Sequence, residues 1–251
     1  MQEYWEIYMK NIDGKVASVL FNAGISMDVE KFKYIYTQVA FIKVKLKEPD
    51  GRGMLSSSNE RSRISYLEDK LEASLIKFRI GKYVGRIISD GYVTFLYYLQ
   101  FTYNWQDFLN FALEDFADYE ITTGYSQDDE WSYYKNLLYP TPIEWQLIQN
   151  HKACDLLHTQ EDNLEIPRFI THKCFFKEDN SKESELKAKL EELGFSILED
   201  IKNQDGYIGF EFMRIDKPFY YDIDELTLYL IELLDEFNAS YDGWECDVIK
   251  A

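Results

Sequence analysis

The second half of the chain alternates strand and helix patterns in an order that few folds accommodate. Strand patterns cover residues 168–177, 195–201, 207–214 and 239–249, and amphipathic helix patterns follow the first and the third of them. This β-α-β-β-α-β order is that of the ferredoxin-like split β-α-β arrangement, in which the last strand pairs with the first. We therefore expect both helices to cover one face of a four-stranded sheet and to leave the other face open.

Capping patterns place the starts of the two helices. Asn180 is followed three residues later by Glu183, and Asp222 is followed by Glu225, as in a capping box. Gly194 suits the position just after the first helix, where a left-handed residue is common. In the third strand, residues 207–214, we expect Ile208, Phe210 and Phe212 to face the helices.

Residues 239–249 combine a strand pattern with a dense acidic load. At the two-residue period of a strand, one set of side chains suits a core: Trp244, Cys246 and Val248. The alternate set is expected on the open face: Tyr241, Gly243, Glu245 and Asp247. Glu211 joins them from the neighbouring strand, and Gly243 leaves room for another backbone to approach.

Charge is concentrated in the same half of the chain. The chain has 251 residues and a net charge of −18, and by count residues 161–251 carry 23 acids and 10 bases. No Lys or Arg lies between Lys217 and Lys250. Such a surface repels phosphate and attracts basic segments, which argues against a nucleic-acid partner; solubility alone is the competing explanation.

The first half predicts a mostly antiparallel sheet with helices. Strand patterns lie at 2–9, 15–22, 35–47, 83–88, 92–98 and 119–125, and helix patterns at 59–79, 104–115, 128–137 and 142–158. The polar stretch 158–163, shortly before Pro167, is the best candidate linker. The fold class is therefore α+β, with an N-terminal domain over 1–162 and a C-terminal domain over 163–251.

The C-terminal half resembles a known regulatory family. Residues 241–245 read Tyr-Asp-Gly-Trp-Glu, follow an amphipathic helix, and share a predicted sheet with His172 on its first strand. In these features residues 165–251 resemble the family of the regulator of ribonuclease activity B, and Cys246 departs from it where Thr or Ser is common. The positions that match the family are His172, Tyr241, Asp242, Gly243, Trp244 and Glu245. The resemblance implies a small acidic protein that binds another protein, because the best-known member inhibits ribonuclease E by binding the enzyme rather than its RNA, with a basic region of the enzyme implicated.

The N-terminal half carries a second resemblance. Residues 130–140, the strand around Trp5, the turn 11–14 and residues 84–86 together resemble an uncharacterised bacterial domain family over about residues 1–145. This resemblance implies no established chemistry.

These patterns predict a non-enzymatic regulator that binds a basic segment of a partner protein, with a ribonuclease as the candidate partner. The predicted partner-binding residues are Glu211, Tyr241, Asp242, Gly243, Glu245 and Asp247. His172 and Trp244 are predicted to be structural, and no cofactor or metal is expected. The N-terminus lacks a signal-peptide pattern, no apolar run approaches the roughly 20 residues of a membrane helix, and three cysteines form no disulfide framework. We therefore expect a cytoplasmic protein.

Alternatives remain open at this stage. A metal protein could use His151, Cys154 and His158, which share one helix face. A hydrolytic enzyme could use His172 as a base beside Cys174 or Cys246. Paired acids, such as Asp222 with Asp224 or Asp242 with Glu245, could bind a divalent cation. The aromatic first half could also make the chain a self-associating scaffold; the sequence does not give the oligomeric state.

Overall fold

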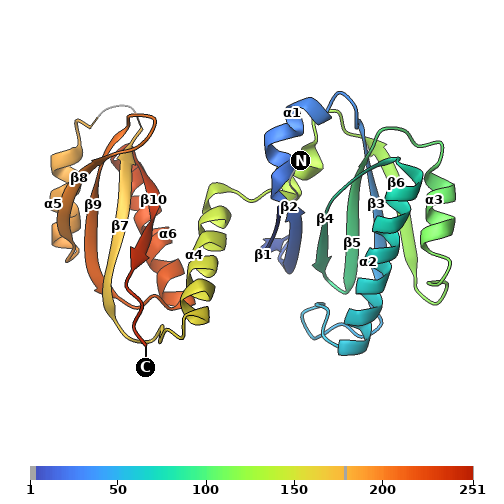
Figure 1. Cartoon of the computed structure of the whole chain (residues 1–251), viewed down its shortest axis with the longest axis horizontal. Helices are drawn as coiled ribbons and strands as arrows, with labels where there is room; N and C mark the ends of the chain where they lie inside the picture. Colours follow the sequence, from blue (N-terminus) through green and yellow to red (C-terminus); the bar gives the residue numbers. More distant parts are fainter. Residues whose placement is uncertain (1–3, 178–179, 251) are drawn as a thin grey trace. The chain divides into compact units, whose positions relative to one another are not determined.

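The structure, a computed structural model, describes residues 4–177 and 180–250 and divides the chain into two compact units. The first is Met1–Pro140 and the second is Thr141–Ala251, and each is built on its own antiparallel sheet (Figure 1). The predicted boundary between 162 and 163 falls after helix α4 (Pro142–Thr159), which the structure assigns to the second unit. Within the stretch predicted as a linker, 158–163, His158 and Thr159 end α4, a turn follows, and the buried carboxylate of Asp162 is held by Arg168 at 2.5 Å.

The sheet of the first unit has the spatial order β1-β2-β4-β5-β3-β6. Its strands are β1 (Trp5–Ile12), β2 (Lys15–Asn22), β3 (Gln38–Lys45), β4 (Gly81–Ser89), β5 (Tyr92–Leu99) and β6 (Ile121–Gln127). The helical elements are η1 (Ala23–Asp28), α1 (Val29–Phe32), α2 (Ser58–Phe78), α3 (Trp105–Ala112) and η2 (Tyr134–Leu138). The mostly antiparallel sheet expected from the sequence is confirmed.

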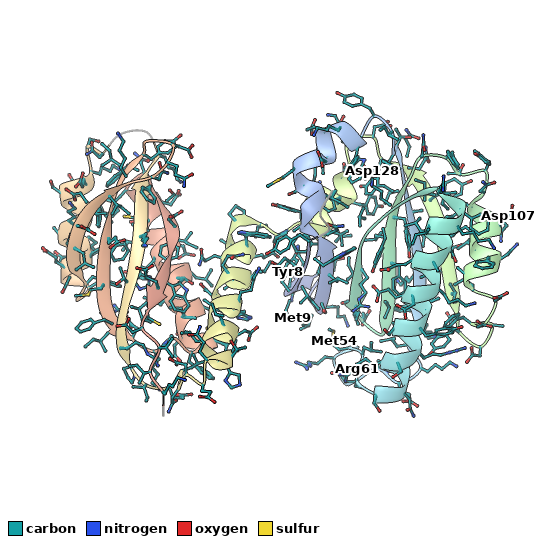
Figure 2. All side chains as sticks on the ribbon, in the orientation of Figure 1. Tyr8, Met9, Met54, Arg61, Asp107 and Asp128 are labelled. Carbon is teal, nitrogen blue, oxygen red and sulfur yellow. The ribbon has the colours of Figure 1, made fainter. Side chains whose placement is uncertain are left out.

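Helices α2 and α3 pack on one face of this sheet. Ile64, Leu67 and Leu71 of α2 and Phe108 of α3 are buried in one cluster with alternate residues of β3 and β5. On β1 burial alternates along the strand, since Tyr8 is buried whereas its neighbour Met9 is exposed; both residues are labelled in Figure 2.

The other face of the sheet is closed by a short turn before η2. The ring of Trp131 stacks on Tyr98 with centroids 3.9 Å apart, and its indole N–H donates to the carbonyl of Tyr36. Trp131 has a φ of +58°, and the Asp128 carboxylate, labelled in Figure 2, accepts the backbone N–H groups of Ser132 and Tyr133. The helix predicted over 128–137 is therefore wrong in its first turn, because residues 128–131 form a turn and the helical residues begin at Ser132, just before η2.

The second unit has the predicted topology. Its strands β7 (Arg168–Phe176), β8 (Ser196–Lys202), β9 (Ile208–Asp216) and β10 (Ala239–Cys246) lie in the order β10-β7-β9-β8 and are all antiparallel to their neighbours. Helix α5 (Glu183–Glu192) connects β7 to β8, and α6 (Tyr220–Glu236) connects β9 to β10. The last strand thus pairs with the first, as the β-α-β-β-α-β pattern requires.

Helices α5 and α6 cover the same face of this sheet. Leu186 and Leu190 of α5 and Leu230 of α6 are buried in one cluster with Phe210 and Phe212 of β9. Helix α4 extends this layer through Cys154 and Leu157, which pack with Ile170, Ile223 and Trp244. No helix that the structure describes within residues 4–177 and 180–250 is long and apolar enough to cross a bilayer.

Three local predictions in this unit are wrong. Asn180 does not cap α5, because the helix starts after Lys182 and the Asn180 amide instead contacts the Glu183 carboxylate. Asp222 does not cap α6, because that helix starts earlier, after Phe219, and places Asp222 in its first turn. Ile208, the first residue of β9, is exposed and is not part of the core cluster under the helices.

Candidate functional site

A β-bulge in β10 organises the sequence that resembles the regulatory family. Tyr241 pairs with Cys174 on β7, but the next paired residue is Gly243, opposite Lys173, so Asp242 is the extra residue of the bulge. Gly243 has a φ of +109°, where side chains other than that of glycine are strained, and no atom lies within 4 Å of the position of a Cβ. Gly243 is therefore required by the backbone conformation of the bulge.

The bulge turns both aromatic residues of the motif toward the helices. Tyr241 packs against the core cluster under α5 and α6, and Trp244 lies opposite His172 on the same covered face. The prediction that Tyr241 lies on the open face is wrong, because the extra residue Asp242 resets the two-residue alternation. The predictions for Gly243 and Glu245 hold, since they lie opposite Lys173 and Thr171 on the uncovered side.

Tyr241 and His172 form a buried polar pair. The Tyr241 hydroxyl lies 2.7 Å from Nδ1 of His172, whose ring stacks on Phe212. Burial, together with the positive charge of Arg214, lowers the pKa of His172 to about 3, and burial raises the pKa of Tyr241 well above its ordinary value. His172 is therefore neutral at physiological pH.

The hydrolytic alternative requires a reactive thiol beside His172, and burial raises the pKa of both candidate thiols, Cys174 and Cys246. The Cys174 thiol is buried on the same face, and burial raises its pKa to about 12. Its sulfur contacts the backbone carbonyl of Phe210 at 3.7 Å. A thiol that stays protonated beside an imidazole that stays neutral is not an activated nucleophile–base pair.

Trp244 is tied to α4 and α6 by the buried amide of Asn150. The Asn150 oxygen accepts hydrogen bonds from the indole N–H of Trp244 and from Gln146, both at 2.9 Å. Its nitrogen donates to Asp224 at 2.9 Å and to Thr227 at 2.7 Å. All hydrogen-bonding positions of this amide are thus used, and they join β10 to both helices.

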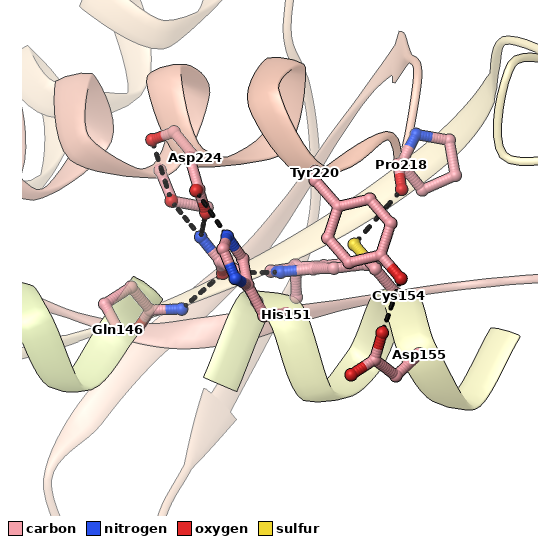
Figure 3. A network of polar contacts seen from close by, with 10 residues as sticks. Gln146, His151, Cys154, Asp155, Pro218, Tyr220 and Asp224 are labelled. Carbon is pink, nitrogen blue, oxygen red and sulfur yellow. Dashed lines mark hydrogen bonds and ion pairs between the residues drawn. The ribbon is translucent and has the colours of Figure 1, made fainter. Parts of the chain in front are cut away.

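The metal alternative does not form a ligand cluster. Figure 3 shows His151 facing Asp224, at 2.7 Å, while the Cys154 thiol donates to the carbonyl of Pro218 at 3.3 Å. His158 lies near the end of α4 and is exposed. Among the residues that the structure describes, no group of three or more His, Cys, Asp or Glu side chains is arranged to hold a metal ion.

The open face of the sheet has a lysine at its centre. Lys173 contacts Glu211 on β9 at 3.3 Å and Glu245 on β10 at 3.2 Å. The hydrogen bond that Lys173 donates to the Glu245 carboxylate raises the pKa of Lys173, so the ammonium stays charged. The face is therefore less negative at its centre than the sequence predicts, while Asp242, in the bulge, and Asp247, just after the end of β10, are exposed.

An apolar pair lies beside these charges on the same face. Phe169 of β7 is directly opposite Ile215 of β9, four residue pairs along the strands from Lys173 and Glu211. The two side chains are 57% and 55% exposed, respectively. This pair was not predicted from the sequence, although the alternation along residues 168–177 places Phe169 on the same side as Lys173.

The acidic residues of α6 form a separate stripe. Its members recur at helical spacing on the exposed side of the helix: Asp222, Glu225, Glu232 and Glu236. Among the described residues, no lysine or arginine forms an ion pair with these four side chains. Much of the negative charge of this unit therefore lies on the helical layer, away from the open face.

The fold and this site define a two-domain α+β protein whose second unit is a split β-α-β module with one open sheet face. Residues 3–139 match the model of a family described as a family of unknown function (DUF695), and residues 147–246 match that of the regulator of ribonuclease activity B. The first match covers more than half of the chain, so the chain belongs to that family. No curated protein matches the chain.

Both resemblances drawn from the sequence are confirmed by these matches. The second match begins within α4, which agrees with the packing of that helix on the second unit. It supports a role in regulating ribonuclease activity.

Proposed function

We propose that the chain is a non-enzymatic regulator of ribonuclease activity, whose second unit binds a basic segment of the ribonuclease on its open sheet face. The proposal depends mainly on one observation: the described helices of this unit all lie on the other face, so the alternate residues of β7, β9 and β10 are presented to solvent. The family match supplies the class of partner.

The open face offers two kinds of contact. Phe169 and Ile215 provide an exposed cross-strand apolar pair that can anchor an aliphatic or aromatic side chain. Glu245, Asp242 and Asp247 provide carboxylates beside it that attract basic side chains. A segment with arginine or lysine next to an apolar residue matches this surface.

Lys173 sets the way in which a basic segment would bind. Lys173 forms ion pairs with both Glu211 and Glu245, and the Glu245 carboxylate is the more exposed of the two. An arginine of the partner can pair with the outer oxygens of Glu245 while Lys173 keeps Glu211, so the face need not lose an existing ion pair. In this arrangement Tyr241 and Gly243 act indirectly, by holding the bulge that presents Asp242 and Glu245.

The test is inhibition of a purified ribonuclease E-type enzyme on a fluorescent RNA. Wild-type chain should inhibit, and inhibition should weaken steeply as salt rises, because exposed charges are screened beyond a Debye length of about 8–10 Å. The double change Glu245→Lys and Asp247→Lys should abolish inhibition without unfolding the unit, since both side chains are exposed.

A matched control lies on α6. Glu232→Lys with Glu236→Lys changes the net charge by the same amount but on the acidic stripe of the helical layer. The proposal requires this variant to inhibit nearly as well as the wild type. Equal loss in both variants would indicate a general charge effect, and loss only in the α6 variant would assign the interaction to the helical layer; either result contradicts the open-face proposal.

Self-association is a second candidate, and one feature of the first unit favours it. Strand β1 is at the edge of its sheet and exposes Ile7 and Met9 on one side. Exposed apolar edge strands readily pair with another chain. If β1 mediates dimers, Ile7→Lys should convert a dimer to a monomer in sedimentation experiments; a wild-type monomer at high micromolar concentration would exclude this function.

A further inference from the structure

A small cavity lies in the first unit where α2 and the start of β4 meet the ends of β1 and β2. Its volume is about 200 Å³. An apolar cavity of about 150 Å³ is known to hold benzene, so this cavity has room for a molecule of one ring and a short substituent. It is smaller than the pockets of about 300–1,000 Å³ that hold drug-sized ligands.

The walls are largely apolar and aromatic. The rings of Trp5 and Tyr83 lie side by side with centroids 5.1 Å apart, and Ile25 and Leu75 line the same space. The hydroxyl of Tyr83 donates to Glu68 at 2.6 Å, which fixes the orientation of this ring. Such walls favour a flat or compact apolar body in the ligand.

One buried polar atom in the lining has no partner among the described residues. Asn22 is only 3% exposed, and its Oδ1 accepts no hydrogen bond from any described residue. The backbone carbonyl of Asn22 accepts the Tyr134 hydroxyl at 2.7 Å, which helps to hold the residue in place. Buried polar groups in folded proteins are nearly always paired, so this acceptor points to a ligand that donates a hydrogen bond.

The charged residues of the lining favour a cation. Glu72 lies on an exposed position of α2 and lines the cavity, and a carboxylate accepts several hydrogen bonds, so it can take a ligand ammonium in addition to its present contacts. The ammonium of Lys82 lies 4.6 Å from the ring centroid of Phe32 and 5.4 Å from that of Tyr36, so its positive charge is already engaged in cation–π contacts with these two rings.

We propose that this cavity binds a small primary amine in its protonated form. The apolar body of the amine packs on Trp5 and Tyr83, and its ammonium donates to Oδ1 of Asn22 and to the carboxylate of Glu72. This ligand site would belong to the first unit alone and is separate from the docking face of the second unit.

Benzylamine is the probe for this site, measured with the full chain by isothermal titration and by ligand-observed NMR. Benzyl alcohol has the same ring and a donor without the charge, and benzoate reverses the charge. Benzylamine should bind saturably at up to millimolar concentration, benzyl alcohol at least about tenfold more weakly, and benzoate not at all, because hydrogen bonds to charged groups are the stronger ones.

Two variants test the residues. Asn22→Leu keeps the volume and removes an unpaired buried acceptor, so it should weaken benzylamine binding at least about tenfold without lowering the melting temperature. Glu72→Gln should weaken binding similarly and cannot disturb the core, since this position is exposed. Asp69→Asn, a matched loss of charge on the same helix outside the cavity, should bind as the wild type does.

The proposal is overturned if benzylamine shows no saturable binding to the folded chain. It is also overturned if the three probes bind equally, or if Glu72→Gln binds as tightly as Asp69→Asn. If the Asn22 variant fails to fold, the comparison of benzylamine binding by Glu72→Gln and Asp69→Asn still tests the proposal, because Glu72 is exposed.

Discussion

Replacing Asn150 with alanine should destabilise the second unit more than any other single change on α4. The amide makes four hydrogen bonds, to Trp244, Gln146, Asp224 and Thr227, and the residue is fully buried. It is the connection through which α4 and α6 hold the bulged strand β10.

The magnitude follows from which partners can find a substitute. The indole N–H of Trp244 would be left unpaired beneath α4, at about 1–3 kcal/mol. Thr227 keeps a contact with the carbonyl of Asp224 at 3.2 Å, and Gln146 can turn to water, so these partners add little. With the small void left by the amide, we expect a loss of about 2–4 kcal/mol in the free energy of unfolding.

The assay is urea unfolding of the full chain, followed by the indole N–H NMR signals of Trp244 and Trp145, which report on the second unit alone. Gln146→Ala is the control, because it removes one bond from the same network and should cost less than about 1 kcal/mol. If Asn150→Ala is as stable as Gln146→Ala within about 0.5 kcal/mol, the reasoning that this amide anchors Trp244 is refuted.

Three further changes have expected outcomes. Because the folded-state pKa of His172 is lowered to about 3, its contribution to the free energy of unfolding is complete above pH 6.5 and falls as the pH drops toward 3. Between pH 7.5 and 5 the free energy of unfolding of the wild type should therefore fall by about 2 kcal/mol more than that of His172→Phe, measured from urea midpoints. Equal pH slopes for the two proteins would contradict this. Trp131→Ala should destabilise the first unit by about 3–5 kcal/mol while the Trp244 signal keeps its urea midpoint, whereas a shift of both units would contradict independent folding. Arg168→Met leaves the buried Asp162 carboxylate without its cation and should cost about 3–5 kcal/mol in urea unfolding; a cost below 1 kcal/mol would show that this ion pair contributes little.

The sequence was sufficient for the architecture of the second unit because its helix and strand periods differ clearly. The alternation of Phe210 and Phe212 and the helical spacing of Leu226, Leu230 and Leu233 fix which faces meet. Strand order then follows from topology rather than from any single residue.

The sequence was insufficient where one residue changes the backbone. Asp242 followed by Gly243 inside a strand is a signal for a bulge, and overlooking it placed Tyr241 on the wrong face. The helix starts were misplaced because Lys182 and Phe219, which are poor capping residues, precede the helices.

Other features depend on tertiary contacts that spacing does not encode. The packing of α4 on the second unit depends on the Asn150 amide meeting Trp244, residues far apart in the sequence. The pairing of Lys173 with Glu211 and Glu245, in contrast, was accessible from strand alternation, and with it the lower charge at the centre of the open face.

The central claim is that a ribonuclease docks on the uncovered side of the four-stranded sheet. Amide NMR of the isotope-labelled chain, titrated with the purified enzyme, tests it most directly. The account predicts that signals broaden first at Thr171, Lys173, Glu211 and Glu245. Broadening centred on Glu225 and Glu232 of α6, or confined to residues before Thr141, would contradict it.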